Sequence, residues 1–268
     1  MKYSLKPVLA AVTFATALLG VASPACANTL EQIMQQKVLR VAIDLSAPPY
    51  GMKNEAMKEV GSDVETATLL AKDLGVKLEI VPTTQANRIP FLLTNKADIV
   101  ISSLSITPER AKVIDFSIPY AVIQSVIGAP KDAAIKEMKD LAGKSVVTAR
   151  GTTNDLNVTK LAPAGTNIVR FENDATAITA ITSGQANIFS TAPSIIAALN
   201  KKDPAKALDI KVVMSTSKMG IGVAKNNSEL KEKINELVRQ NLKNGELNTI
   251  FKKYHATDLP ADVLAEGK

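Results

Sequence analysis

The sequence has 268 residues, and its 32 lysines and arginines against 26 aspartates and glutamates give a formal net charge of +6 at pH 7. The basic residues are scattered without a basic block, and there is no tryptophan. Because nucleic-acid binding calls for a clustered basic face with stacking aromatic side chains, this composition argues against a nucleic-acid partner.

Residues 1–27 have the pattern of an export signal, with two early lysines, an apolar run over residues 8–20 and a small-residue cleavage site. The apolar run is shorter than the about 20 residues that a membrane-spanning helix needs. We expect cleavage after Ala27 and a periplasmic location. Cys26 raises the alternative of lipid attachment, which the residues before it disfavour. Cleavage leaves 30 basic and 26 acidic residues and no cysteine.

The mature chain, about 240 residues long, can form one large or two modest domains. In its first half, predicted strands alternate with predicted helices. This order indicates parallel strands with helices on both faces of a sheet, and ligands then bind at the carboxyl ends of the strands. The predicted strands are residues 38–43, 76–81 and 99–101, and the predicted helices are 62–74 and 87–93.

A second series of the same kind begins near Gln124. At the end of this series, residues 220–224 form a predicted glycine-bearing strand, suited to carry the chain back to the first series. A predicted helix then begins at Ser228 and ends at Gly245. The lone His255 is expected to lie in a polar tail. The other predicted strands are residues 144–148, 167–171, 186–190 and 210–214, and the predicted helices are 175–182 and 193–199.

Arg110 follows a strand and a row of hydroxyl residues, in the first turn of a short predicted helix. Thr107 suits the N-cap and Pro108 the first helical position. A cation there is disfavoured by the positive end of the helix dipole, so its presence makes sense if an anion binds among the free backbone N–H groups and hydroxyls. The alternative is that Arg110 pairs with Glu109 or Asp115 on a solvated face.

The run S-S-L-S-I-T-P-E-R-A-K-V-I-D-F-S-I-P-Y, residues 102–120, resembles the signature of the family 3 extracellular solute-binding proteins. These are the polar amino-acid receptors of bacterial ABC importers. The resemblance extends from about Val38 to Tyr254 and is looser in the second half. It implies an α/β periplasmic binding protein fold of two lobes, each a mostly parallel sheet flanked by helices, with a two-strand hinge.

The resemblance also implies how the chain is divided between the lobes. Lobe I would be discontinuous and consist of residues 28–122 and 218–268. Residues 123–217 would form lobe II, inserted between the two parts of lobe I. Two crossings between the lobes make a hinge that lets them close on a ligand.

In this family the arginine corresponding to Arg110 grips the ligand's α-carboxylate, with help from hydroxyls that correspond to Ser103 and Ser105. The turn after Gly151 resembles the contact from the other lobe, which involves Thr152 and Thr153. The alternative for these four residues is that their hydroxyls only cap the local turns and the helix. A cap hydroxyl can also face the cleft, so both roles can hold together.

Arg88 lies in the run A-N-R-I-P, which is similar to family members that bind glutamate and aspartate, where the arginine helps to hold the side-chain carboxylate. The alternative is a surface arginine that pairs with an acid such as Asp44. Asp44 ends the first predicted strand. It could receive a ligand cation, neutralise Arg88 or cap the following turn.

The sequence departs from the family pattern at several ligand positions. Thr191 stands where the family usually has the aspartate that pairs with the α-ammonium group. Ala47 and Gln85 replace aromatic residues that often flank the ligand side chain, and Tyr50 remains nearby. These changes put in doubt that the ligand is a standard α-amino acid.

Arg88 and Arg110 would face Asp44 as the only acid in the cleft. An uncompensated buried charge is expensive, so the ligand should supply negative charge. We therefore expect acidic or polar ligands to outcompete lysine, arginine and ornithine.

The resemblance predicts a monomeric periplasmic receptor that delivers a small carboxylate-bearing solute to an ABC permease in the inner membrane. No phosphate loop, metal-ligand spacing or nucleophile–histidine pair is recognisable, so no cofactor, metal or catalytic residue is predicted. The rival interpretation is an enzyme similar to cyclohexadienyl dehydratases, with Asp44 as its proton donor. A receptor sensor domain is a third, less favoured interpretation.

Overall fold

A computed structural model describes residues 29–268, whose principal strands form two five-stranded sheets. The predicted signal segment, its cleavage site and Cys26 lie outside the described residues. None of the helices between residues 29 and 268 has the length and apolar character of a membrane span.

The first sheet has the strand order β4-β1-β5-β12-β6. β1 pairs in parallel with both of its neighbours, and only β12 runs against the strands beside it. The central strands β1 and β5 are buried apolar segments, as the sequence predicts. The strands of this sheet are β1 (Val38–Ile43), β4 (Lys77–Pro82), β5 (Ile99–Val100), β6 (Ile114–Phe116) and β12 (Gly222–Ala224).

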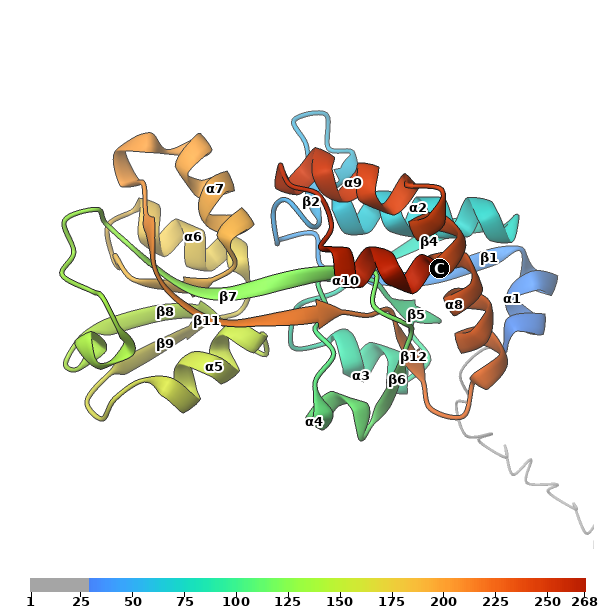
Figure 1. Ribbon diagram of the computed structural model, residues 1–268, viewed down its shortest axis with the longest axis horizontal. Coiled ribbons are helices and arrows are strands. Elements are labelled where there is room, and N and C mark those ends of the chain that lie inside the picture. The colour runs from blue at the N-terminus through green and yellow to red at the C-terminus, as the bar shows by residue number, and fades with distance from the viewer. Residues whose placement is uncertain (1–28) are drawn as a thin grey trace, which may run out of the picture.

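Helices from both ends of the chain surround this sheet (Figure 1). A two-stranded ribbon, β2 (Met52–Lys53) with β3 (Glu59–Val60), leads into α2. The helices are α1 (Leu30–Gln36), α2 (Ser62–Leu74), α3 (Arg88–Leu93), α4 (Pro108–Ala111), α8 (Ser228–Lys243), α9 (Glu246–His255), α10 (Ala261–Leu264) and the 3-10 turn η3 (Ala265–Gly267).

The second sheet has the order β11-β7-β10-β8-β9, and here β7 is the one strand that runs against its neighbours. Its strands are β7 (Ala121–Ala129), β8 (Ser145–Ala149), β9 (Asn167–Phe171), β10 (Phe189–Thr191) and β11 (Asp209–Met219). Its helices are α5 (Thr153–Leu161), α6 (Asp174–Thr182) and α7 (Pro193–Lys202), with the 3-10 turns η1 (Met138–Leu141) and η2 (Pro204–Lys206).

The strands β7 and β11 connect the two halves of the molecule. They pair in antiparallel register from Ala129 with Asp209 to Ala121 with Met219. Figure 1 shows this pair running from one sheet to the other, with helices grouped around each end. The predicted fold class, two mostly parallel sheets with flanking helices and a two-strand hinge, is confirmed. The boundaries of lobe I (28–122 and 218–268) and lobe II (123–217) stay a prediction.

The return crossing was predicted at residues 220–224, and this is wrong. β11 makes the crossing, while β12 (Gly222–Ala224) lies inside the first sheet. The sequence does not reveal the full length of β11, because residues Ser215 to Lys218 are polar. This part of the strand is stabilised by pairing with β7 and has no apolar pattern. Packing is tight at Gly222, because a Cβ there would lie 3.0 Å from Cδ2 of Leu104.

The polar tail predicted after Gly245 is also wrong, because helix α9 continues to His255. Gly245 makes the turn between α8 and α9 with a φ of 84°. Leu247, Ile250 and Phe251 of α9 are buried, at the i, i+3, i+4 spacing of an amphipathic helix.

His255 packs with its ring centroid 4.5 Å from that of Phe251 and 4.8 Å from that of Tyr50. Its Nε2 lies 3.2 Å from Oγ of Ser62. Burial lowers the pKa of His255 to about 4, so the imidazole is neutral at physiological pH. The sole histidine therefore fixes α9 against the start of α2 instead of being solvated.

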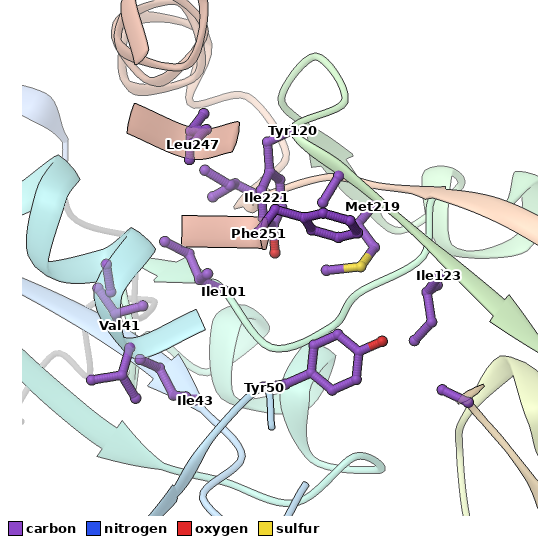
Figure 2. Packing of buried hydrophobic residues seen from close by; sticks show 14 of the residues in the cluster. Val41, Ile43, Tyr50, Ile101, Tyr120, Ile123, Met219, Ile221, Leu247 and Phe251 are labelled. Atoms are coloured by element: carbon purple, nitrogen blue, oxygen red, sulfur yellow. The ribbon is translucent and has the colours of Figure 1, made fainter. Parts of the chain in front are cut away.

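The largest apolar core continues through the hinge (Figure 2). Tyr120, just before β7, and Ile123 of β7 belong to the same cluster as Val41 and Ile43 of the first sheet. On the other side the cluster includes Phe189 of β10. The two lobes therefore share apolar packing next to the crossing strands.

Asp63 ties three segments together near the hinge. Its side chain is only 2% exposed, and it accepts hydrogen bonds from the backbone N–H of Ser103 at 2.8 Å and from the hydroxyl of Tyr120 at 3.3 Å. Its place in the first turn of α2 favours the carboxylate through the helix dipole. Burial nevertheless dominates and raises the pKa of Asp63 from 3.8 to about 7.

This raised pKa predicts a pH-dependent stability. The folded protein holds the Asp63 proton more tightly than the unfolded chain, so its contribution to the free energy of unfolding is largest below pH 3.8 and is lost as the pH rises to about 7. Asp63→Asn removes this loss. We expect the free energy of unfolding of the variant, relative to that of wild type, to increase by about 1–3 kcal/mol as the pH rises from 5 to 8. Urea unfolding at several pH values measures this change. The exposed Glu59→Gln serves as control, and a difference independent of pH would contradict the prediction.

Candidate functional site

Polar side chains follow the carboxyl ends of strands in both sheets and meet in an enclosed cavity between them. In parallel sheets this is the edge where ligands bind. The cavity encloses about 10 Å³, room for about one water molecule, so a larger solute can enter only if the lobes part. Its lining residues are Tyr50, Gln85, Arg88, Ser103, Ile123, Thr152, Thr153, Asn154, Asp174 and Ile195.

A larger, open depression of about 1140 Å³ lies between residues 45–56 and helices α6 and α7. Its charged lining residues are Lys53, Glu55 and Lys202, none of which is buried. The enclosed cavity, by contrast, gathers buried charges from both lobes. For this chemical reason we take the smaller cavity as the candidate site.

Arg110 lies in α4. Thr107 caps this helix by accepting a hydrogen bond from the backbone N–H of Arg110 at 3.2 Å. Its side chain is buried, at 8% exposure. The guanidinium donates to the carbonyl of Ser105 at 2.8 Å and, across the cleft, to the carbonyl of Gly151 at 3.1 Å. The alternative of an ion pair with Glu109 or Asp115 on a solvated face is therefore wrong.

Burial also lowers the pKa of Arg110 to about 10, which still leaves it charged at neutral pH. Among the described residues its hydrogen-bond partners are neutral carbonyls, and the charge of Glu109 is the one that offsets the effect of burial. Such a group binds an anion well, because a hydrogen bond to a carboxylate is about twice as strong as one to a neutral acceptor.

The two serines lie at the end of β5 as predicted. Ser103 has a φ of 44°, a left-handed conformation that is unusual for a non-glycine residue, and it lines the cavity. The Ser105 hydroxyl lies 3.2 Å from the hydroxyl of Thr153 on the other lobe. Hydroxyls from both sides of the cleft thus already contact each other.

The turn at Gly151 supplies the opposite wall. Thr152 caps α5 by accepting a hydrogen bond from the Asp155 N–H at 3.0 Å, and its hydroxyl donates to Ala149 at 2.8 Å. Its hydroxyl therefore has the capping role given as the alternative, although the residue also lines the cavity. The hydroxyl of Thr153 instead lies within hydrogen-bond distance of the Ser105 hydroxyl.

Gly151 itself is required by the approach of the lobes. Its φ is +75°, and a Cβ there would lie 2.9 Å from the Cα of Ala86 on lobe I. Any side chain would force the two backbones apart.

Arg88 is neither a surface residue nor a partner of Asp44, so that alternative is wrong. Its side chain is 2% exposed and donates only to main-chain carbonyls. These are Gln85 and Ser102, both at 2.8 Å, Ser103 at 3.3 Å and Gly151 at 3.1 Å. Burial, and then the nearby Arg110, lower the pKa of Arg88 to about 9.

Asp44 and Thr191 are both buried, and each keeps an oxygen without a hydrogen-bond partner among the described residues: Oδ2 of Asp44 and Oγ1 of Thr191. Oδ1 of Asp44 accepts from the backbone N–H and the hydroxyl of Ser46, so Asp44 does cap the following turn. Neither residue lines the enclosed cavity, although Asp44 lies close enough to act on the charge of Arg88.

Tyr50 lines the cavity, and its hydroxyl accepts from Ser194 of lobe II at 3.1 Å. Burial raises the pKa of the Tyr50 phenol, so it stays protonated. Figure 2 shows Tyr50 beside the hinge residue Ile123. Gln85, in a position noted as aromatic in the family, also lines the cavity.

Asp174 and Asn154 line the cavity and were not predicted from the sequence. The signal that could have found Asp174 is its place three residues after β9, at the same strand edge as the other site residues. Asn154 follows the Thr152-Thr153 pair directly.

The predicted charge balance was incomplete. Asp63 and Asp174 are buried close to Arg88, so Asp44 is not the only acid in this region. The described residues contain no group of three or more acidic, histidine or cysteine side chains arranged to hold a metal ion. What the arrangement can do is bind a small anion through two arginines, with hydrogen-bond acceptors around it.

Comparison with known proteins identifies the family of the chain. A family model for bacterial extracellular solute-binding proteins, family 3, matches residues 39–257. The glutamine-binding protein of Geobacillus stearothermophilus is 36% identical over 204 residues, or 74% of this chain and 77% of that protein.

Two solved structures are similar along most of the chain. A mutant of ArgBP from T. maritima has a TM-score of 0.78 at 34% identity and covers 85% of this chain and 99% of its own. An ancestral amino acid-binding protein, a precursor of cyclohexadienyl dehydratase, has a TM-score of 0.77 at 34% identity and covers 84% and 98%. The family match spans well over half of the sequence and both lobes, so the chain belongs to the bacterial extracellular solute-binding proteins of family 3.

Proposed function

We propose that the protein binds an amino acid between its lobes and delivers it to an ABC permease in the inner membrane. The single observation that carries the proposal is the pair of buried arginines, Arg88 and Arg110, that both donate to the Gly151 carbonyl from the opposite lobe. The glutamine-binding relative and the amino acid-binding structural neighbour support this substrate class.

The carboxylate of the ligand takes the place of the Gly151 carbonyl at Arg110. A charge-assisted hydrogen bond contributes roughly 1.5–3 kcal/mol, and micromolar binding needs about 8 kcal/mol. The remainder comes from Ser103, Ser105 and Thr153 and from backbone N–H groups at the start of α5. Closure of the lobes then excludes water and strengthens each of these contacts.

Among amino acids we propose a polar ligand, with glutamate and aspartate included in the test panel. The sequence argued against cationic ligands because two arginines, Arg88 and Arg110, would face a single acid, Asp44. The buried Asp63 and Asp174 weaken that reason. The protein would act in the periplasm as a monomer after loss of residues 1–27.

The enzyme alternative is not favoured. The relatives that share the family are binding proteins, and the neighbour linked to cyclohexadienyl dehydratase is itself an amino acid-binding protein. Asp44, the proposed proton donor, holds Ser46 through Oδ1 and does not line the enclosed cavity.

Arg110→Ala should weaken binding of the best-bound amino acid by about 2–5 kcal/mol, the range for truncating one partner of a buried charge pair. Isothermal titration calorimetry on wild type and variant measures the change. Lys112→Ala, an exposed cation two residues away, is the control and should bind as wild type does. Equal affinity in the Arg110 variant would remove this arginine from the site.

Gly151→Ala should impair closure, because the added Cβ would meet the backbone of Ala86. We expect binding weakened by about tenfold or more, roughly 1.4 kcal/mol. Small-angle scattering should also show a smaller compaction on saturation. Gly143→Ala is a matched control, since its φ is +71° but no atom lies within 4 Å of its Cβ position. If both variants lost the same affinity, backbone strain rather than lobe contact would be responsible.

Incubation with prephenate or arogenate should leave either compound intact, because the proposed role is binding. Product formation is followed by absorbance and mass spectrometry over hours at high protein concentration. Turnover that disappears in Asp44→Asn would establish the enzyme interpretation instead.

A further inference from the structure

Asp174 presents a buried carboxylate to the enclosed cavity. It opens helix α6 directly after the cap residue Asn173, and its side chain is 3% exposed. It lines the cavity together with Arg88 and Tyr50. Within residues 29–268, the side chains that act on its carboxylate do so through their charge, Asp44 and Arg88, and not through a hydrogen bond.

A carboxylate in this position is costly in either protonation state. Burial, and then the charge of Asp44, raise the pKa of Asp174 to about 7, while Arg88 acts in the opposite direction. The ionised form lacks a partner, and the neutral form carries a buried O–H donor. A group that brings positive charge and donors to Asp174 would relieve this cost.

The rest of the cleft shows the same imbalance between acceptors and donors. Oδ1 of Asn154, which lines the cavity, is buried without a hydrogen-bond partner among the described residues. Oδ2 of Asp44 and Oγ1 of Thr191 are also buried without a partner, although these two residues lie outside the cavity lining. The guanidinium donors of Arg88 and Arg110, in contrast, point to the Gly151 carbonyl. A complementary solute therefore carries an anionic end for the arginines and a donor-rich cationic end for the acceptors.

We propose that Asp174 of lobe II binds the cationic nitrogen of the solute, an ammonium or guanidinium group, while Arg110 of lobe I binds its carboxylate. This inference rests on the proposed function. Asp174 is a better partner than Asp44, because Oδ1 of Asp44 already accepts two hydrogen bonds from Ser46. Asp174 lines the enclosed cavity, whereas Asp44 and Arg110 lie outside its lining. A zwitterion held in this way links the lobes by opposite charges at its two ends.

The test compares Asp174→Asn with wild type by isothermal titration calorimetry, using paired probes. L-glutamine is paired with glutaramate, the same molecule without its α-amino group, and L-lysine with L-norleucine, which lacks the side-chain amine. Asp174→Asn keeps the size and an acceptor oxygen but removes the charge. Glu172→Gln makes the same chemical change at an exposed position two residues away.

We expect Asp174→Asn to weaken amine-bearing probes by about tenfold or more and Glu172→Gln to leave them unchanged. If the α-ammonium is bound, glutamine weakens and glutaramate does not, while lysine and norleucine weaken together. If a side-chain cation is bound, lysine weakens and norleucine does not. Unchanged binding in Asp174→Asn, or equal losses with and without the amine, overturns the assignment of Asp174 but leaves the proposed function standing. A wild-type protein that binds no amino acid in the panel overturns both.

A second measurement needs only wild type, so it does not depend on folding of the variant. Binding of a cation lowers the pKa of Asp174, so an amine-bearing probe should release protons near pH 6.5, which calorimetry in buffers of different ionisation heat detects. The charged or titratable groups that act on Asp174 are Asp44, Arg88 and Tyr50. Equal proton release by glutamine and glutaramate, and by lysine and norleucine, would contradict the proposal.

Discussion

Two guanidinium groups, those of Arg88 and Arg110, are buried at the cleft and form no hydrogen bond or ion pair with a carboxylate among residues 29–268. Arg88 and Arg110 are satisfied by main-chain carbonyls, and the carbonyl of Gly151 on the opposite lobe serves both. Removing a guanidinium from water costs more than neutral acceptors return, which is why burial lowers the pKa of each arginine.

The acids near the cleft form the second half of this electrostatic arrangement. Asp63 is anchored by Ser103 and Tyr120, so it stabilises the strand-end loop that carries the site. Asp174 has no such anchor, although its pKa is raised to the same value of about 7. Asp63 therefore has a structural role, whereas Asp174 is the acid that we propose binds the solute.

Much of the fold could be predicted because its signals are local. The strand at 38–43, the helix at 62–74 and the strand at 167–171 have the predicted bounds, since apolar runs and a terminal glycine fix them. β11 and the burial of Arg88 depend on partners far along the chain, and a single sequence does not reveal them. Asp174 follows β9 closely, which places it at the ligand-binding edge of the sheet, but its burial beside Arg88 again depends on contacts far along the chain.

The hinge and the arginines together explain how a small solute can control the closure of the lobes. Few hydrogen bonds join the lobes across the cleft among the described residues: two from arginines to the Gly151 carbonyl, and two between neutral groups, the Ser105–Thr153 hydroxyl pair and the Ser194–Tyr50 bond. A neutral hydrogen bond stabilises by about 0.5–1.5 kcal/mol net, whereas one to a charged group contributes roughly 1.5–3 kcal/mol. In the proposed complex a carboxylate takes the place of the Gly151 carbonyl at Arg110, and its hydrogen bond is stronger because both partners are charged. Because a ligand shifts such an equilibrium only by its preference for one state, the proposed ligand favours closure only if it also contacts lobe II.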